Sequence, residues 1–360
     1  MKLIVQPADG VAPLVKAIKQ AKKSVEIVIF RFDEVEIERA LEDAAQRGVF
    51  VHALIAFTNR GGERNLRKLE MRFLEKGITV ARTADDLVRY HGKMMIVDGK
   101  ELYILSYNFT HLDIERSRSF GIVTKNRELV SEASRLFECD TKRQSYNTKA
   151  ENFVVSPANA RARLEDFLKR AKRELLIYDV DIADKSIIRI LEERAQAGVR
   201  IKIIGHIARN KHVLARQFRR MRLHTRVIIR DCKLAFVGSQ SLRKLELDAR
   251  REIGIIVNNA KIVRSLVTVF EDDWKASAAA DPKAAKKQVS AHAERASKKV
   301  TRVVSSKIAP APIVQHVLKA IEKEANVELD HAEATAVVKG AIRKAVKKAA
   351  VRIVEEAAAD

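Results

Sequence analysis

The sequence predicts a duplicated α/β domain with pseudo-two-fold symmetry, followed by a basic helical C-terminal tail. Three observations lead to this fold class: a helix and strand pattern occurs twice, a short polar motif occurs twice, and the composition changes after Trp274. Repetition on this scale indicates duplicated structural units. We therefore expect one half at residues 1–145, a second half at 146–275, and an Ala/Lys-rich linker with a helical tail at 276–360.

The repeat begins with the end of a basic helix and the apolar strand that follows it. It reads AIKQAKKSVEIVIF at residues 17–30 and FLKRAKRELLIYDV at residues 167–180, an offset of 150. Basic residues are typical of a helix end, and the short apolar run after them indicates a strand.

A second helix and a second strand follow in each copy. Apolar residues recur at helical spacing up to Gly48 in one copy and Gly198 in the other, and a β-branched run comes next. Glycine at this place is typical of a helix C-cap before a strand. Residues 17–55 and 167–205 are therefore expected to form equivalent β-α-β units.

The offset then becomes 133, since His91 corresponds to His224 and Asp98 to Asp231. The first half therefore holds 17 residues that have no counterpart in the second half. We place them near the stretch LEKGITVARTADD, with an extra strand at 78–80.

The composition favours an anionic partner. Apolar residues make up 47% of the chain, enough for a buried core, while the formal net charge is +22 and the pI is about 10.0. A charge of this size attracts nucleic acid, an acidic membrane surface or a phosphorylated substrate.

Targeting signals and cysteine chemistry are not indicated. No apolar run is long enough for a transmembrane segment or a signal peptide. Cys139 and Cys232 form neither a metal-ligand spacing nor a disulfide framework, so we expect ordinary free thiols. These features predict a cytoplasmic location, with peripheral contact to a membrane or to nucleic acid through the basic surface and the tail.

The repeated polar motif collects groups that bind and attack phosphate. In HGKMMIVDG, His91 and Lys93 are two residues apart, and the turn signal DGK separates two apolar strands. Ser106 and Asn108, also two apart, come at the end of the second strand. An imidazole, an ammonium, a hydroxyl and an amide would then lie close together, and the last three are groups that bind phosphate oxygens.

Two such copies facing each other across a two-fold axis would place two imidazoles at one phosphate. A neutral histidine can attack phosphorus and form a phosphohistidine, while a protonated one donates to the leaving oxygen and then activates water. The fixed cations of the motif would neutralise the negative charge of the phosphate, so the sequence predicts no metal and no cofactor. The coupled pair predicts a mildly acidic or neutral pH optimum.

The spacing of His91, Lys93 and Asp98 resembles the HxKxxxxD motif of the phospholipase D superfamily. The resemblance covers residues 1–275, with a second copy of the motif, HxRxxxxD, at His224. It implies duplicated α/β/α domains and a phosphodiester substrate. Members of this superfamily include phospholipases D, cardiolipin and phosphatidylserine synthases, and nucleases.

The resemblance also implies roles for individual residues. His91 would be the nucleophile and His224 the general acid; the reverse assignment stays open. The predicted catalytic residues are His91, Lys93, Asp98, His224, Arg226, Asp231 and Glu252, and the predicted phosphate-binding residues are Ser106, Asn108 and Ser239. Asp98 and Asp231 would brace the motif loops.

Several positions depart from the superfamily pattern. Leu105 stands in place of a glycine in the first half, Ser241 in place of an asparagine in the second, and Arg226 in place of the motif lysine. Arginine binds phosphate, but its larger and rigid fork makes the exchange non-conservative. If these changes mark decay, the chain is a binding protein on an old catalytic fold.

The carboxylate that orients each histidine is present in one half only. Glu252 follows His224 at the spacing that the resemblance requires, so we expect Glu252 to orient His224. Ser119 occupies the equivalent place in the first half. Asp113 and Glu115 are the candidates to replace the missing carboxylate near His91.

The sequence leaves two classes of anionic substrate open, phospholipids and nucleic acids. We favour a phospholipid, because the basic surface and the amphipathic tail would attach the chain to an anionic membrane. DNA or RNA is the alternative, because the basic stretches at 58–73 and 205–226 precede the two motifs and would follow a phosphate backbone. Amphipathic runs at 309–325 and 335–357 predict tail helices that pack together or contact membrane or nucleic acid. We expect structural roles for the other histidines, which are His52, His111, His206, His212, His292, His316 and His331.

Overall fold

The structure is a computed structural model of the 360-residue chain. It describes residues 1–58, 63–148, 150–208, 213–279, 315–316, 318, 332, 335–338 and 340–341. The chain divides into two compact units, Met1–Ala279 and Ala280–Asp360. The predicted tail lies almost entirely outside the described residues. Ala278–Ala279 form a short strand, and the few described residues from 315 onward are helical.

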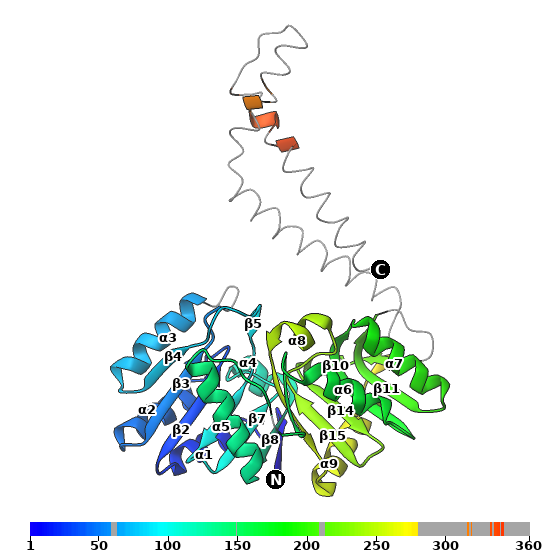
Figure 1. Ribbon diagram of the computed structural model, residues 1–360, viewed down its shortest axis with the longest axis horizontal. Coiled ribbons are helices and arrows are strands. Elements are labelled where there is room, and N and C mark those ends of the chain that lie inside the picture. Colours follow the sequence, from blue (N-terminus) through cyan, green and yellow to red (C-terminus); the bar gives the residue numbers. More distant parts are fainter. Residues whose placement is uncertain are drawn as a thin grey trace. The chain divides into compact units, whose positions relative to one another are not determined.

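The two halves of the first unit have matching elements (Figure 1). Those of the first half are β1 (Lys2–Gln6), α1 (Ala12–Gln20), β2 (Ser24–Ile29), α2 (Val35–Gln46), β3 (Phe50–Ile55), α3 (Glu63–Glu75), β4 (Thr79–Arg82), β5 (Arg89–Tyr90), β6 (Met94–Val97), β7 (Glu101–Leu105), α4 (His111–Glu115), β8 (Ser117–Thr124) and α5 (Arg127–Thr141). Those of the second half are β9 (Phe153–Val155), α6 (Ala160–Lys169), β10 (Glu174–Ile182), α7 (Lys185–Gln196), β11 (Arg200–Ile207), β12 (Leu214–Gln217), β13 (Arg222–Leu223), β14 (Arg226–Arg230), β15 (Leu234–Gly238), α8 (Lys244–Asp248), β16 (Arg250–Arg251), β17 (Ile253–Val257), α9 (Ala260–Lys275) and β18 (Ala278–Ala279).

The order of strands confirms the predicted duplication. The first sheet runs β1-β8-β7-β6-β2-β3-β4, and the second runs β9-β17-β15-β14-β10-β11-β12 with β18 added at its end. Each position in one sheet is taken by the equivalent strand in the other. The parallel β2–β3 and β10–β11 pairs come from the two β-α-β units that the sequence predicts.

Three apolar clusters arrange these elements in layers (Figure 1). One cluster packs α1, α2 and α3 on the outer face of the first sheet, and another packs α6 and α7 on the outer face of the second. The third joins the inner faces of both sheets with α5 and α9. The halves therefore share a central core, and neither could bury its inner face alone.

The predicted extra strand of the first half has a counterpart. Strand β4 exists, but β12 takes the same place beside β11 that β4 takes beside β3. Helix α3 has no equivalent among the described residues of the second half, where the element after β11 is β12. The added segment is therefore this amphipathic helix, and the prediction of an extra strand was wrong.

Buried ion pairs connect the two halves in a symmetric way. Arg118 donates to Asp273 through Nε and Nη2 at 2.7 and 3.0 Å, and Arg251 lies 3.0 Å from Asp140. Arg118 corresponds to Arg251, and Asp140 corresponds to Asp273. Each arginine pairs with the aspartate of the opposite half. Each arginine also donates to a backbone carbonyl of its own half. Because an unpaired buried charge is costly, each half depends on the other for these contacts.

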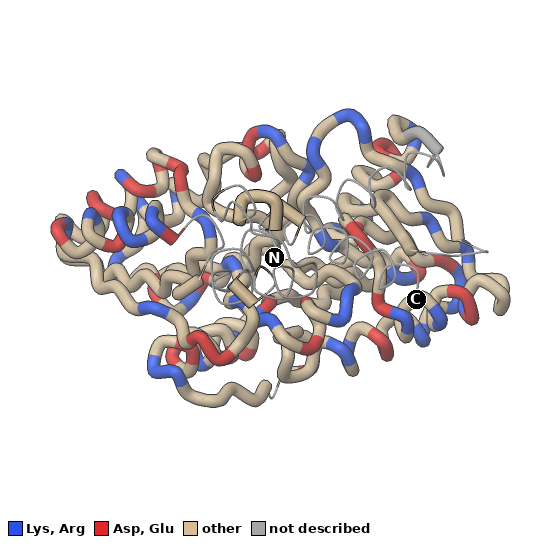
Figure 2. Tube along the Cα trace, turned by 90° about the horizontal axis from the view of Figure 1, so that it is seen from above, with Lys and Arg blue, Asp and Glu red and all other residues tan. Residues whose placement is uncertain are grey.

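The surface carries both signs of charge despite the excess of cations. In Figure 2, Lys and Arg alternate with Asp and Glu along helices of both halves. Many are exposed pairs at helical spacing, such as Lys142 with Glu138 and Arg189 with Glu193, which contribute little to stability. In the part of the chain that the structure describes, no helix combines the length and apolarity that a bilayer span requires.

Two equivalent hairpin turns hold the aspartates of the repeated motif. Asp98 and Gly99 both have positive φ angles, of 55° and 60°, between β6 and β7. At the second turn Asp231 and Cys232 both have φ of 55°. Such a turn requires two residues in the left-handed backbone conformation. Glycine adopts this conformation easily, and cysteine does not. Cys232 is therefore a strained position on the surface.

Replacing Cys232 by glycine should stabilise the protein. The left-handed conformation costs a non-glycine residue roughly 1–2 kcal/mol, and glycine adds about 0.5–1 kcal/mol of backbone entropy to the unfolded chain. We expect Cys232→Gly to raise the free energy of unfolding by about 0.5–1 kcal/mol in urea titrations. The matched change Gly99→Ala should lower it by about 1 kcal/mol. A Cys232→Gly protein that is less stable than the wild type would contradict this account.

Candidate active site

The two motif histidines lie at the boundary between the halves. His91 lies between β5 and β6, and His224 lies between β13 and β14. Both residues are more than nine-tenths buried. The backbone N–H of His91 donates to Arg251 O at 2.7 Å, and that of His224 donates to Arg118 O at 3.1 Å. The short pairs β5–β16 and β13–β8 make these contacts, so each histidine is held by the opposite half.

His91 contacts one carboxylate and one ammonium. Its Nδ1 lies 2.8 Å from Glu252 Oε2, which belongs to the second half. Lys93 Nζ donates to the backbone carbonyl of His91 at 2.6 Å and lies 2.8 and 2.9 Å from the two ring nitrogens. The ring of Phe30 packs edge-on at 4.5 Å between centroids. The imidazole is thus fixed in position beside a buried cation.

His224 is paired with Asp113 of the first half. Its Nδ1 lies 3.3 Å from Asp113 Oδ2, in ion-pair contact but not aligned as a hydrogen bond. Asp113 also accepts from the backbone and side-chain amides of Asn108, at 2.9 and 2.6 Å, and pairs with Arg222. The short helix α4 therefore presents one carboxylate to the opposite half.

These contacts correct the predicted pairing of acids and histidines. Glu252 was expected to orient His224, and Asp113 was expected to lie near His91; the structure places each beside the other histidine. The other candidate, Glu115, pairs with His111 on the surface. Both histidines therefore have a carboxylate. Glu252 therefore gives no reason to assign His224 as the nucleophile.

Burial and nearby cations lower the pKa values of both imidazoles. Burial lowers the pKa of His91 well below its usual range, and Lys93 and Arg226 lower it further. Burial also lowers the pKa of His224 well below its usual range, but the carboxylate of Asp113 acts in the opposite direction. Lys93 of one half and Arg226 of the other affect both imidazoles, which shows that the two motifs form one electrostatic site.

Lys93 and Glu252 are fully buried partners of His91. Burial lowers the pKa of Lys93 well below its usual range, although the charge of Glu252 opposes this effect. Burial raises the pKa of Glu252, while Lys93 and a hydrogen bond from Ser239 lower it. Each group is thus stabilised in its charged form mainly by the other, across the boundary between the halves.

Arg226 and Ser241 replace lysine and asparagine together. Arg226 Nε donates to Ser241 Oγ at 2.9 Å, so the shorter side chain makes room for the longer one. Asp179 interacts with the same arginine. Burial raises the pKa of Asp179 to about 6, while the charge of Arg226 and several hydrogen bonds lower it. Arg226 Nη1 is buried and has no hydrogen-bond partner among the described residues. This N–H group is a donor that a phosphate oxygen could accept from.

The predicted phosphate-binding serines make structural hydrogen bonds. Ser106 Oγ accepts from Phe120 N at 2.9 Å and from the hydroxyl of Thr225, in the other half, at 3.0 Å. Ser239 Oγ accepts from Ile253 N at 3.1 Å. Both serines thus fix adjacent strands at the site. Asn108 differs, because its Oδ1 is buried without a partner in the described structure.

Asp98 and Asp231 lie at the far ends of β6 and β14 from the histidines. The Asp98 carboxylate accepts hydrogen bonds from the backbone N–H groups of residues 22–24, at 2.6–3.1 Å. Asp231 accepts in the same way from residues 172–174, at 2.7–3.2 Å. These carboxylates connect the motif hairpins to the turns that precede β2 and β10, and the structure does not bring them to the imidazoles.

Leu105 is part of the core. A Cβ atom added at Gly121 would lie 2.8 Å from the Leu105 side chain, so the leucine fills the space above this glycine. In the second half Gly238 faces Gly254 instead, and Phe236 fills the space. The loss of the motif glycine is therefore a packing difference, and it leaves the imidazoles untouched.

Asp179 and Thr225 belong to the site but were not singled out from the sequence. Asp179 supports Arg226 and Ser241, and Thr225 holds Ser106 across the boundary. Thr225 lies inside the second motif, where Gly92 stands in the first, so its position was a signal. Asp179 corresponds to Ile29 in the first half. A carboxylate within an otherwise apolar strand was a second signal.

Comparison with known proteins gives matches over both halves. A family model described as Cardiolipin synthase, PLD-like domain matches residues 14–141 and 164–274. Mitochondrial cardiolipin hydrolase of Danio rerio is 30% identical over 118 residues, 32% of this chain and 50% of that protein. The protein of the same name from Mus musculus is 29% identical over 122 residues, 34% of this chain and 53% of that protein. The chain thus spans about half the length of the curated relatives it matches.

Solved structures share the duplicated fold. Polyphosphate kinase from Porphyromonas gingivalis superposes with a TM-score of 0.66 at 19% identity, over 76% of this chain and 47% of that chain. Phosphatidylserine synthase from Haemophilus influenzae superposes with a TM-score of 0.59 at 10% identity, over 77% of this chain and 87% of that chain. At these identities the likeness concerns the arrangement of helices and strands.

The paired change at Arg226 and Ser241 predicts strong coupling in stability. Ser241→Asn alone should crowd the buried arginine, and Arg226→Lys alone should leave Ser241 without its donor and alter the charge beside Asp179, each costing about 1–3 kcal/mol. The double variant recreates the Lys and Asn combination of the first half. We expect it to recover about 1–2 kcal/mol relative to the sum of the single changes in urea unfolding. Strict additivity would show that the two residues do not compensate for each other.

Proposed function

Since the chain belongs to the family of cardiolipin synthase, PLD-like domains, we propose that it cleaves a phosphodiester with two histidines. His91 is the nucleophile and His224 is the general acid. One observation supports this assignment above others: each buried imidazole is in contact with a carboxylate of the opposite half, and both lie in the field of Lys93 and Arg226.

Electrostatics favour this division of roles. A nucleophile must be neutral, and burial together with cations keeps His91 unprotonated. With its Nδ1–H donating to Glu252, His91 would present the Nε2 lone pair to phosphorus. A general acid must carry a proton, and the negative charge of Asp113 favours protonated His224. An anionic substrate would favour the imidazolium further.

The reaction then proceeds in two balanced steps. In the first, His91 Nε2 forms a bond to phosphorus, the bond to the leaving oxygen breaks, and His224 gives that oxygen its proton. In the second, neutral His224 takes a proton from water, whose oxygen displaces the histidine from phosphorus. Transfer to an alcohol would use the same second step with an alcohol in place of water.

Fixed donors near the imidazoles are suited to hold the phosphoryl oxygens. Lys93 Nζ lies against the ring of His91, and Arg226 Nη1 is buried without a partner among the described residues. Cations held in place in a water-poor site stabilise the charge that develops on these oxygens. We assign no metal ion to the reacting phosphate.

A phospholipid is the substrate that we favour. Leu112 and Leu245 occupy equivalent places on α4 and α8, the helices that follow Asn108 and Ser241, and both are exposed, at 49% and 42%. Val88, 50% exposed, hydrogen-bonds to the end of α8. Apolar side chains beside a cationic site suit an anionic lipid surface. Cardiolipin hydrolases and phosphatidylserine synthase, by their names, act on phospholipids.

Two alternatives use the same features differently. In the first, the cations around the site hold the backbone of DNA or RNA, and the chain is a nuclease. In the second, the site binds an anion without cleaving it. Compensated changes at Arg226, Leu105 and Ser119 favour a working site over decay, because each has a partner that restores packing or charge.

Loss of either histidine should abolish turnover. We expect the wild type to hydrolyse bis(p-nitrophenyl) phosphate in excess EDTA, and His91→Ala and His224→Ala to reduce kcat by at least about 10³-fold. A phosphorylated enzyme should accumulate in His224→Ala, detected after an alkaline quench that preserves the P–N bond, and be absent from His91→Ala. His206→Ala, which removes a surface histidine paired with Asp181, is the matched control and should retain full turnover.

The outcomes separate the candidate functions. Turnover of cardiolipin vesicles above that of single-stranded DNA, lost in both active-site variants, identifies a phospholipid substrate. The reverse preference identifies a nuclease. If wild type and His91→Ala behave alike on the synthetic ester, on vesicles and on DNA, the catalytic proposal is wrong and the site is one for binding.

Removing the charge of Asp113 should move the pH profile. The carboxylate raises the pKa of His224, so Asp113→Asn lowers it and reduces the protonated fraction at neutral pH. The basic limb of kcat/KM should therefore shift to lower pH, with about a tenfold loss at pH 7 for each pKa unit. Glu193→Gln, on the exposed face of α7, is the control. An unchanged basic limb in Asp113→Asn would exclude His224 as the acid that Asp113 tunes.

A further inference from the structure

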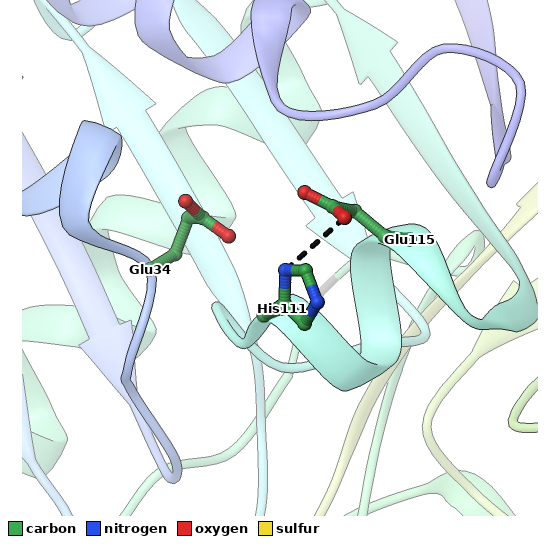
Figure 3. Close-up of side chains that lie close together, drawn as sticks. All are labelled: Glu34, His111 and Glu115. Carbon is green, nitrogen blue, oxygen red and sulfur yellow. Dashed lines mark ion pairs between the residues drawn. The ribbon is translucent and has the colours of Figure 1, made fainter.

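A cluster of possible metal ligands lies outside the candidate active site. Glu34, at the start of α2, faces His111 and Glu115 of α4, as Figure 3 shows. One ligand atom from each residue lies within 4.8 Å of the others. His111 Nδ1 and Glu115 Oε2 are 3.1 Å apart. The cluster therefore joins the β2–α2 connection to the helix that carries Asp113.

Glu34 is the buried member of this cluster. Its side chain is only 8% exposed, and Oε2 has no hydrogen-bond partner among the described residues. Burial raises the pKa of Glu34, and the carboxylates of Glu115 and Glu36 raise it further, while a hydrogen bond from the backbone of Glu36 and the charge of His111 lower it. A buried carboxylate oxygen without a donor, aimed at an imidazole and a second carboxylate, requires a cation or a proton.

The second half shows what satisfies the equivalent carboxylates there. Asp184 begins α7 as Glu34 begins α2, and Asp248 ends α8 as Glu115 ends α4. Arg161 bridges the two, with Nη2 2.7 Å from Asp184 Oδ2 and Nε 2.6 Å from Asp248 Oδ1. A guanidinium thus occupies the space between the two carboxylates.

The first half has no arginine at this place. The position equivalent to Arg161 is Val11, at the same offset of 150 that relates the two β-α-β units. Val11 packs against the outer apolar cluster of the first half and cannot pair with a carboxylate. Glu34 and Glu115 therefore keep the arrangement of Asp184 and Asp248 but lack the cation.

We propose that Glu34, His111 and Glu115 bind a Zn²⁺ ion in place of this guanidinium. Imidazole and carboxylate oxygen are suitable zinc ligands, and three protein ligands leave one position of a tetrahedral site for water. Ligand distances of about 2.0–2.2 Å require only that the three side chains move together. The neutral imidazole contributes Nδ1, which already faces Glu115.

The ion would act on the fold around the active site. His111 N donates to Asp33 Oδ1 at 2.8 Å, and Glu34 N donates to Phe109 O at 3.3 Å, so backbone contacts already join the two segments. Zinc would connect their side chains as well. Because Asp113 lies on the same helix as His111, the ion would steady the carboxylate that contacts His224. The proposal does not depend on the catalytic one.

Zinc binding can be measured directly with the full chain. Protein freed of metal with EDTA and then dialysed is titrated with Zn²⁺ in competition with a chromophoric chelator. We expect a single site in the wild type, weakened at least about tenfold by Glu34→Gln and by His111→Ala. Excess Zn²⁺ should raise Tm in the wild type and leave Tm unchanged in Glu34→Gln.

Val11→Arg is the decisive variant. It supplies the cation that the second half uses, so it should abolish this zinc site while the protein stays folded and its Tm without metal is equal to or above that of the wild type. His206→Ala, which removes an imidazole paired with one carboxylate, should bind zinc like the wild type. Zinc binding that survives both Glu34→Gln and Val11→Arg, or no binding in the wild type, would overturn the proposal.

Discussion

The structure depends on an exchange of buried charges between its two halves. Arg118 pairs with Asp273, and Arg251 pairs with Asp140, so the same contact is made twice with partners from opposite halves. A buried ion that loses its partner costs several kcal/mol, so the halves are not independent domains in energetic terms. Contacts between acids and imidazoles also cross between the halves, because Glu252 reaches His91 and Asp113 reaches His224. The geometry of the site therefore depends on the association of the halves, as the buried ion pairs do.

Departures from internal symmetry come with compensating changes. Arg226 is longer than Lys93, and Ser241 is shorter than Asn108, so the two pairs fill similar volumes. The carboxylate lost at Ser119 is supplied by Asp113, which lies on α4, a different element. Ser119 instead donates to the backbone of His224. Such coordinated changes are expected where packing and charge are both constrained, because a single change would leave a cavity or an unpaired ion.

The fold followed from the sequence more completely than the site did. Gly48 and Gly198 marked equivalent helix ends, and both β-α-β units lie where their periodicity placed them. The predicted pairing of acids with histidines was wrong. It was based on spacing within each half, whereas the contacts cross between the halves. The partner of His91 is 161 residues away in the chain. The 17 added residues of the first half were also misplaced, because the strand β12, the counterpart of β4, was not recognised in the sequence of the second half.

The balance of charge at the boundary connects substrate binding to protonation. His91 lies in the field of Lys93, Arg226, Arg250 and Arg89, while burial opposes any further positive charge on the ring. A bound phosphodiester would offset part of this field, and imidazolium formation would then become more favourable at His224, beside Asp113. Anion binding and protonation of the acid therefore favour each other. Substrate arrival itself would thus help to set the protonation state that the reaction requires.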